Sequence, residues 1–171
     1  MVGESCVKGY LDNTLVSAMG KQEHQSDLVA LTALFALRDA GVISLVTSEV
    51  THREVQRYKS SSRPDIEKVY DALEKVPLVE MNELVGISSH WDRHGGWNSP
   101  IFEDDPIWLG LLGLNLDPTD AHHVMVAVRA RCDAFLTVDK RTILNRRASV
   151  ETKFPIRLQT PSEFLASVSQ P

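Results

Sequence analysis

The segment 134–139, with the sequence AFLTVD, constrains the fold more strongly than any other part of the chain. It is a nearly continuous apolar run, and such runs are typical of strands that are covered on both faces. Strands of this kind belong to parallel sheets that carry helices on their two faces. The segment therefore predicts an α/β fold.

Strand-like and helical segments alternate along the rest of the chain. Further strands are predicted at 7–12, 42–47 and about 156–159. Helices are predicted at 26–40, 48–59, 65–76 and 118–131, in a basic stretch after 140, and at 161–168. Because helices follow the strands, we expect a three-layer α/β/α sandwich with a mostly parallel central sheet.

Length and composition indicate one folded domain. The chain has 171 residues, of which 43% are apolar and 24% charged. This usage excludes the disordered, collagen-like and disulfide-scaffold classes. The stretch 86–100 (GISSHWDRHGGWNSP) has no sustained period and predicts a long surface loop or lid. We expect a single domain over 1–171, with a loop or insertion at about 86–116.

The sequence also bears on the cellular setting. It begins without the apolar core of a signal peptide and contains no run near the roughly 20 apolar residues that cross a bilayer. Cys6 and Cys132 lie far apart and outside any CxxC pair, as expected for free thiols in a reducing compartment. We therefore expect a cytoplasmic protein that does not enter a membrane.

Four acidic residues fall at equivalent places in this pattern. Asp12 and Asp139 end predicted strands, while Glu49 and Asp120 lie in the first turns of predicted helices. In an open α/β sheet these places share one edge, where ligand sites are usually built. Gathered carboxylates repel one another unless a hard cation lies among them, so Mg²⁺ or Mn²⁺ is the expected cofactor.

Each acid also has an ordinary structural explanation. Glu49, and Asp120 three residues after Asp117, fit the preference of helix N-termini for acids. Aspartates at strand ends are common turn formers. It is the coincidence of four acids on one predicted edge that favours a site.

The same residues carry a family resemblance. The segments YLDNTLVS, TSEVTHREV, DAHHVMVAV, CDAFLTVDK and QTPSEFLAS follow one another as in PIN-domain ribonucleases, and the resemblance covers nearly the whole chain. It implies a metal-dependent endoribonuclease that hydrolyses the phosphodiester bonds of single-stranded or structured RNA. It also implies the catalytic and metal-binding set, which is Asp12, Glu49, Asp120 and Asp139.

Two positions near these acids depart from the family or vary within it. Thr14 stands two places after Asp12, where its hydroxyl is expected to orient a metal-bound water or phosphate. Arg141 stands where many members have a further acid or amide. This argues against a second metal ion, and Arg141 is expected to offer a positive charge to the substrate phosphate. The missing acid also supports the alternative of a catalytically weak or inactive PIN-fold module that binds RNA or protein.

The resemblance bears on partners as well. PIN domains commonly form dimers, so we expect a homodimer. A toxin with an antitoxin-like protein partner, a stand-alone RNA-processing enzyme and a subunit of a larger assembly all stay open. A glycine-rich phosphate loop of the GxGxxG or GxxxxGK[ST] type is absent from the sequence, which excludes the Rossmann and P-loop classes.

The net charge of −5 taken alone argues against a protein that binds nucleic acid through its global charge. Four of the 23 acids, however, are the predicted ligands. The bases gather at 129–147, which predicts a track for phosphates beside the site. The predicted substrate-binding residues are Thr14, Lys140, Arg141, Arg146 and Arg147.

The histidines and tryptophans give weaker indications of function than the acids do. His122 and His123 lie on an apolar part of a predicted helix, which favours packing and hydrogen bonding over catalysis. Trp91 and Trp97 fall in the predicted loop, where stacking on bases, folding over the core and a dimer contact all stay open.

Overall fold

The computed structural model describes residues 6–17, 24–48, 51, 71, 75–79 and 105–169. Its elements are β1 (Val7–Leu11), α1 (Thr14–Ser17), α2 (Gln25–Asp39), β2 (Ile43–Val46), α5 (Pro106–Leu112), α6 (Pro118–Arg129), β3 (Ala134–Leu136), the 3₁₀ turn η4 (Leu144–Arg146), α7 (Arg147–Lys153), β4 (Arg157–Gln159) and α8 (Pro161–Val168). The loop predicted at 86–100 and almost all of the helices predicted at 48–59 and 65–76 lie outside the described residues.

The four strands form one sheet in the order β2-β1-β3-β4, and every pairing is parallel. Tyr10 of β1 lies opposite Val46 of β2 and Phe135 of β3. An isolated parallel bridge between Thr47 and Leu78 continues the sheet beyond β2. The predicted parallel α/β fold is therefore confirmed.

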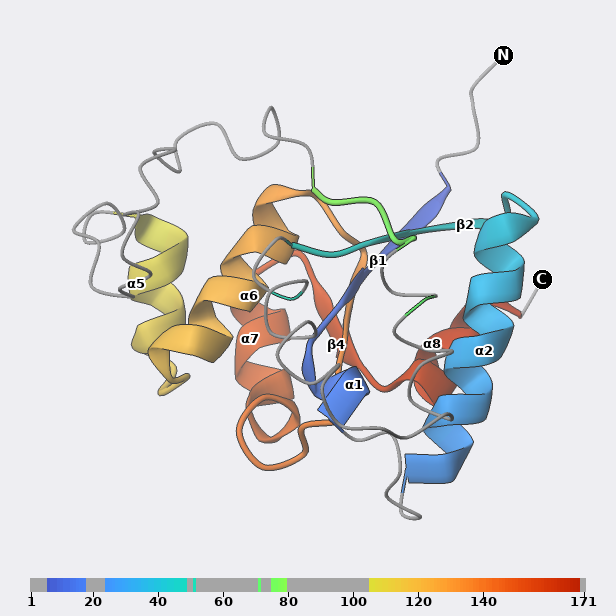
Figure 1. The fold of residues 1–171 in the computed structure, drawn as a ribbon. Helices are drawn as coiled ribbons and strands as arrows, with labels where there is room; N and C mark the ends of the chain where they lie inside the picture. The colour runs from blue at the N-terminus through green and yellow to red at the C-terminus, as the bar shows by residue number, and fades with distance from the viewer. Residues whose placement is uncertain are drawn as a thin grey trace.

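Helices cover both faces of this sheet, with α2 and α8 on one side and α5, α6 and α7 on the other (Figure 1). Successive strand residues point to opposite faces, so Leu11 packs in the α2 and α8 layer while Tyr10 packs in the α6 layer. Leu136 and Phe135 divide in the same way. This two-sided burial explains why 134–139 is almost entirely apolar.

Helix ends agree closely with the sequence signals. After α2 the chain reverses at Gly41, which has a φ of 74° and whose N–H donates to the carbonyl of Arg38 (2.9 Å). The carboxylate of Asp117 accepts from the N–H groups of Thr119 and Asp120 and so begins α6. Thr160 begins α8 with a capping box.

The helix α5 lies within the segment 86–116, which we expected to be a loop or insertion. Asp105 begins it by accepting from the N–H groups of Ile107 and Trp108 (2.8 and 3.2 Å), and the same carboxylate pairs with Arg129 of α6. Gly110 lets this helix approach α7, because a Cβ there would lie 2.8 Å from the ring of Phe154. Capping and packing thus make this stretch helical. Within the described ranges, no helix is both long and apolar enough to cross a membrane.

Candidate functional site

The carboxyl ends of the parallel strands lie at one edge of the sheet, and the predicted acids follow them. Asp12 comes directly after β1, and its N–H donates to the carbonyl of Leu136 at the end of β3 (3.1 Å). Asp139 lies three residues after that carbonyl. Glu49, the predicted ligand after β2, lies outside the described residues. The structure thus brings two of the predicted acids to neighbouring strand ends.

Asp12 is almost completely buried, with 1% of its surface exposed. Its Oδ2 accepts from the hydroxyls of Thr14 (2.6 Å) and Thr137 (2.8 Å), and its Oδ1 accepts from the N–H of Asn13 (2.9 Å). Burial raises the pKa of this carboxyl, and the charge of His123 and the hydrogen bonds oppose that shift. The side chain is therefore held in one orientation.

Thr137 connects the two strand ends. Its side chain is fully buried, its hydroxyl donates to Asp12, and its oxygen accepts from the N–H of Asp139 (3.1 Å). The hydroxyl of Thr14 lies 2.8 Å from the same oxygen. A single threonine therefore sets the relative positions of both acids.

Asp139 has a different environment. Its Oδ1 accepts from the N–H groups of Arg141 and Thr142 (both 2.8 Å), and its Oδ2 accepts from the hydroxyl of Thr142 (2.8 Å). Burial acts to raise its pKa, but the bonds from Thr142 and Arg141 and the Arg141 charge together hold the pKa below its usual value. The carboxylate is thus ionised and organises the turn after β3.

Asp120 joins these acids from the first turn of α6. Burial raises its pKa to about 7, with further contributions from Asp117 and from the charge of Asp12, while a hydrogen bond with Thr142 acts in the opposite direction. Its Oδ2 is buried and has no hydrogen-bond partner among the described residues. Asp120 is therefore the acid whose negative charge is least compensated.

A second buried polar group lies beside Asp12. The hydroxyl of Tyr10 donates to Ser48 Oγ (2.8 Å) and lies 3.0 Å from Nδ1 of His123. The N–H of Thr51 donates to Ser48 Oγ (3.4 Å), as expected for the predicted helix start at Ser48. Burial lowers the pKa of the neighbouring His122 to about 3. Both His122 and His123 are buried, with 2% of each exposed.

The chemistry of the acidic side chains at this edge indicates whether they suit a divalent cation. Asp12 and Asp120 interact through their charges, and Asp120 has a buried oxygen without a hydrogen-bond partner in the described part of the chain. Both features suit a hard cation. As the described side chains lie, however, no group of three or more His, Cys, Asp or Glu residues can hold a metal ion. Mg²⁺ commonly retains several waters, so it does not require three protein ligands.

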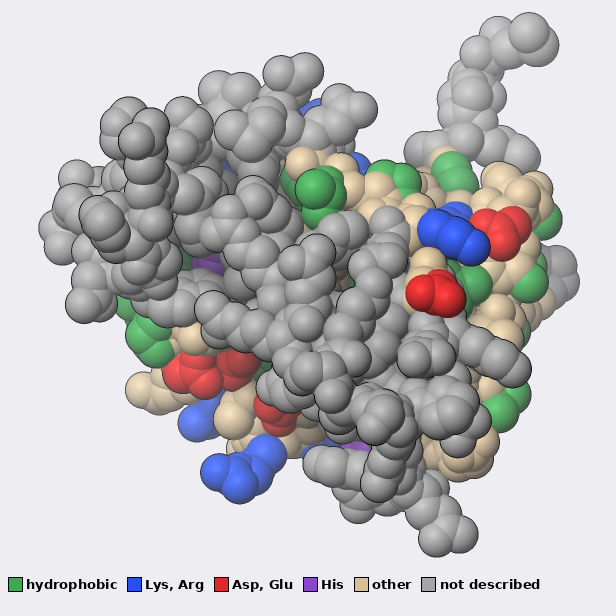
Figure 2. All heavy atoms as spheres, viewed as in Figure 1, with side chains coloured by type: hydrophobic (Ala, Val, Ile, Leu, Met, Phe, Trp, Pro, Cys, Tyr) green, Lys and Arg blue, Asp and Glu red, His purple; other side chains and the backbone are tan. Residues whose placement is uncertain are grey.

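The predicted basic track divides into two parts. Arg147 forms a bidentate ion pair with Glu163 (2.9 and 2.6 Å), and Arg129 pairs with Asp105. Lys140, Arg141 and Arg146 form no ion pair with another described residue. Figure 2 shows acidic and basic side chains together at the lower left of the view, below α5 and α6 in Figure 1. Fewer of the described basic residues are thus available to bind phosphate than the sequence suggested.

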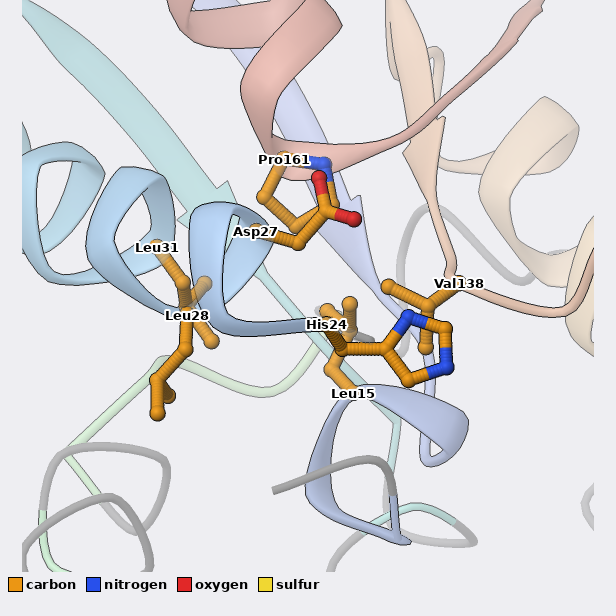
Figure 3. A pocket seen from close by; sticks show the side chains of 7 residues that line it. All are labelled: Leu15, His24, Asp27, Leu28, Leu31, Val138 and Pro161. Atoms are coloured by element: carbon orange, nitrogen blue, oxygen red, sulfur yellow. The ribbon is translucent and has the colours of Figure 1, made fainter. Parts of the chain in front are cut away.

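A small hollow adjoins the site on the α2 side of the sheet edge (Figure 3). It is lined by Leu15, His24, Asp27, Leu28, Leu31, Val138 and Pro161. The carboxylate of Asp27 accepts from the hydroxyl of Ser162 (2.7 Å) and so joins α2 to α8. The residues that line this hollow are mostly apolar.

Sequence reasoning assigned no role to Thr137, Thr142 or Tyr10. The first two have a recognisable signal, because each lies two or three residues from a predicted ligand on the same strand-to-helix connection. Tyr10 has no such signal, since its partners Ser48 and His123 are 38 and 113 residues away in the chain.

Comparisons with known proteins add no further assignment. The chain matches no protein-family model, no curated protein and no solved structure. The parallel α/β fold is therefore established by the structure itself, and the acids at its sheet edge are the features that bear on function.

Proposed function

We propose that this protein is a metal-dependent ribonuclease that hydrolyses phosphodiester bonds with Mg²⁺ or Mn²⁺. The observation that supports it most is the linked set of three acids at one sheet edge. Thr137 bonds to Asp12 and Asp139, and the charge of Asp12 acts on Asp120. Carboxylates in this number beside exposed bases suit a cation and a phosphate.

The residues that would hold the cation are Asp12, through Oδ1, and Asp120, with Asp139 as a further predicted ligand. Glu49 is the fourth predicted ligand. Held by these residues, a divalent ion would supply an activated water and would offset negative charge on the leaving oxygen. The chain itself then has to orient these acids, which Thr14, Thr137 and Thr142 do by hydrogen bonding.

The exposed bases have a separate role in this proposal. Lys140 and Arg141 follow Asp139 directly and lie on the surface. Their charges are positioned to attract the phosphate backbone and to hold a phosphate against the acids. The choice of RNA, and the expected homodimer or antitoxin-like partner, follow from the resemblance to PIN domains and stay predictions.

Cleavage of a 5′-labelled single-stranded RNA tests the proposal. We expect products with Mn²⁺, none with EDTA, and none with Asp120→Asn. Asp39→Asn is the matched control, because Asp39 is an exposed aspartate at the far end of α2 that pairs with Arg38. RNA that is bound but stays intact across several sequences would instead support the binding-module alternative.

A further inference from the structure

A buried hydrogen-bond network joins three segments of the chain that lie next to the acids. The hydroxyl of Tyr10, in β1, donates to Ser48 Oγ (2.8 Å) and lies 3.0 Å from Nδ1 of His123 in α6. All three side chains are buried. The phenol of Tyr10 thus connects the sheet to the chain that follows β2 and to the helix that packs on the sheet.

The number of hydrogens in this network limits how it can be arranged. A phenol has one hydrogen, and that of Tyr10 points to Ser48 Oγ. The same Oγ accepts from the N–H of Thr51 (3.4 Å), so both of its lone pairs are in use. The contact with Nδ1 of His123 therefore requires Nδ1–H as the donor and the phenol oxygen as the acceptor. The neutral imidazole that fits this network carries its proton on Nδ1.

Packing holds the ring of Tyr10 independently of its hydroxyl. The ring stacks on Phe135 of the neighbouring strand β3, with ring centroids 5.3 Å apart and planes 11° apart. Both rings belong to the apolar cluster that includes Val124, the residue after His123. Replacement of Tyr10 by phenylalanine therefore removes the hydrogen bonds and leaves the aromatic packing.

We propose that Tyr10 is a positioning residue whose hydroxyl fixes the tautomer of His123 and holds α6 and the chain at Ser48 against β1. Each of these segments carries a predicted ligand within three residues of the network, namely Asp12 after Tyr10, Glu49 after Ser48 and Asp120 before His123. A shift of any one segment would move its acid away from the others. This role rests on the proposed function, whereas the tautomer of His123 does not.

The first test needs neither metal nor catalysis. Two-bond ¹H–¹⁵N correlation NMR at pH 8 shows which ring nitrogen of His123 carries the proton, and His123→Gln identifies its signals by their loss. We expect Nδ1–H in wild type. Tyr10→Phe removes the oxygen that accepts from Nδ1–H, so the proton should move to Nε2.

A second variant keeps the phenol and removes its acceptor. Ser48→Ala combined with Thr51→Val removes two hydroxyls whose oxygens lie 3.5 Å apart. The hydrogen of Tyr10 should then turn to Nδ1 of His123, which moves the imidazole proton to Nε2. Ser48→Thr keeps a hydroxyl at this place and should retain Nδ1–H.

The matched control is Ser162→Ala. It removes a serine hydroxyl that donates to Asp27 (2.7 Å) and joins α2 to α8 on the other face of the sheet, so His123 should stay unchanged. The proposal is overturned if Nδ1 is unprotonated in wild type, or if the proton stays on Nδ1 in Tyr10→Phe or in the double variant. If the double variant does not fold, Tyr10→Phe decides alone.

Binding of Mn²⁺ tests the effect on the acids. Calorimetric titration should give about a tenfold weaker Kd for Tyr10→Phe, because residues that support metal ligands typically affect metal affinity by about 10- to 100-fold. Ser162→Ala should bind as wild type does. If wild type binds no Mn²⁺ while the His123 proton moves as expected, the proposed function fails and the tautomer assignment stands. An unchanged Kd in Tyr10→Phe, with wild type binding Mn²⁺, overturns the positioning role.

Discussion

Asp12 and Asp139 follow neighbouring strands of one sheet, yet their surroundings differ. Asp12 is buried and bonded to two hydroxyls, and its pKa is raised. Asp139 is partly exposed, bonded by the turn that follows it, and its pKa is lowered. Topology brings the acids together, but burial and local hydrogen bonds determine the charge each carries.

This difference suggests a division of labour within the site. A buried carboxylate with a raised pKa gains most from a nearby cation, whereas an ionised carboxylate that caps a turn already has its partners. We therefore expect Asp12 and Asp120 to depend on metal, and Asp139 to maintain the turn that carries Lys140 and Arg141.

The largest expected effect is on cleavage by Asp12→Asn. This change keeps the shape of the side chain and removes the charge that would bind the cation, so we expect at least about a 100-fold loss of RNA cleavage, more than the loss of a hydrogen-bonding partner would cause. Initial rates with Mn²⁺ measure it. Wild-type rates in the variant would show that the buried acid takes no part.

The pH dependence of stability tests the charge on Asp120. Its pKa of about 7 in the folded chain lies above the ordinary value of 3.8, so the folded state binds a proton more readily than the unfolded state. The contribution of Asp120 to stability should therefore be largest below about pH 4, decrease as pH rises, and level off above about pH 7. Allowing for solvent screening, we expect a decrease of about 2 kcal/mol in the free energy of unfolding.

Urea unfolding between pH 4 and 8 measures this decrease. Asp120→Asn should remove much of it, while Asp39→Asn should follow wild type. Mn²⁺ at pH 8 should recover stability in wild type but not in Asp120→Asn. If the free energy of unfolding depends on pH in the same way for wild type and Asp120→Asn, the charged form of Asp120 is not destabilised in the folded chain.

Thr137→Val breaks the connection between the two strand ends. It removes the hydroxyl that donates to Asp12 and accepts from Asp139, so we expect a roughly tenfold loss of cleavage and a loss of about 1 kcal/mol of stability. Thr137→Ser should recover both. Rates and unfolding curves that match wild type would show that the two acids are positioned independently.

The smallest expected effect concerns the exposed bases. Arg141→Gln should weaken binding of single-stranded RNA about threefold and lower the slope of log K against log salt by roughly 0.7. Arg157→Gln is the matched control, because Arg157 is exposed at the start of β4, on the opposite edge of the sheet. Fluorescence anisotropy at several salt concentrations measures RNA binding by both variants. Equal slopes for the two variants would show that Arg141 does not contact the substrate phosphates.

The positions of the strands and the helix ends were predictable where the signals are local. The apolar run before Asp139 and the glycine at 41 each mark a feature that the structure contains at that place. The Arg147–Glu163 pair and the bond between Tyr10 and His123 were not predictable, because their partners meet only after the layers pack. For the same reason the opposite pKa shifts of Asp12 and Asp139 could not be inferred from their similar sequence positions.

We propose that Asp12 and Asp120 together hold a divalent cation. Titration of the metal-free protein with Mg²⁺, followed by carboxyl ¹³C NMR, tests it most directly. We expect the signals of Asp12 and Asp120 to shift together with one Kd, and we expect Asp120→Asn to abolish the shift at Asp12. Mg²⁺-dependent shifts confined to exposed acids such as Asp39, with Asp12 and Asp120 unchanged, would contradict it.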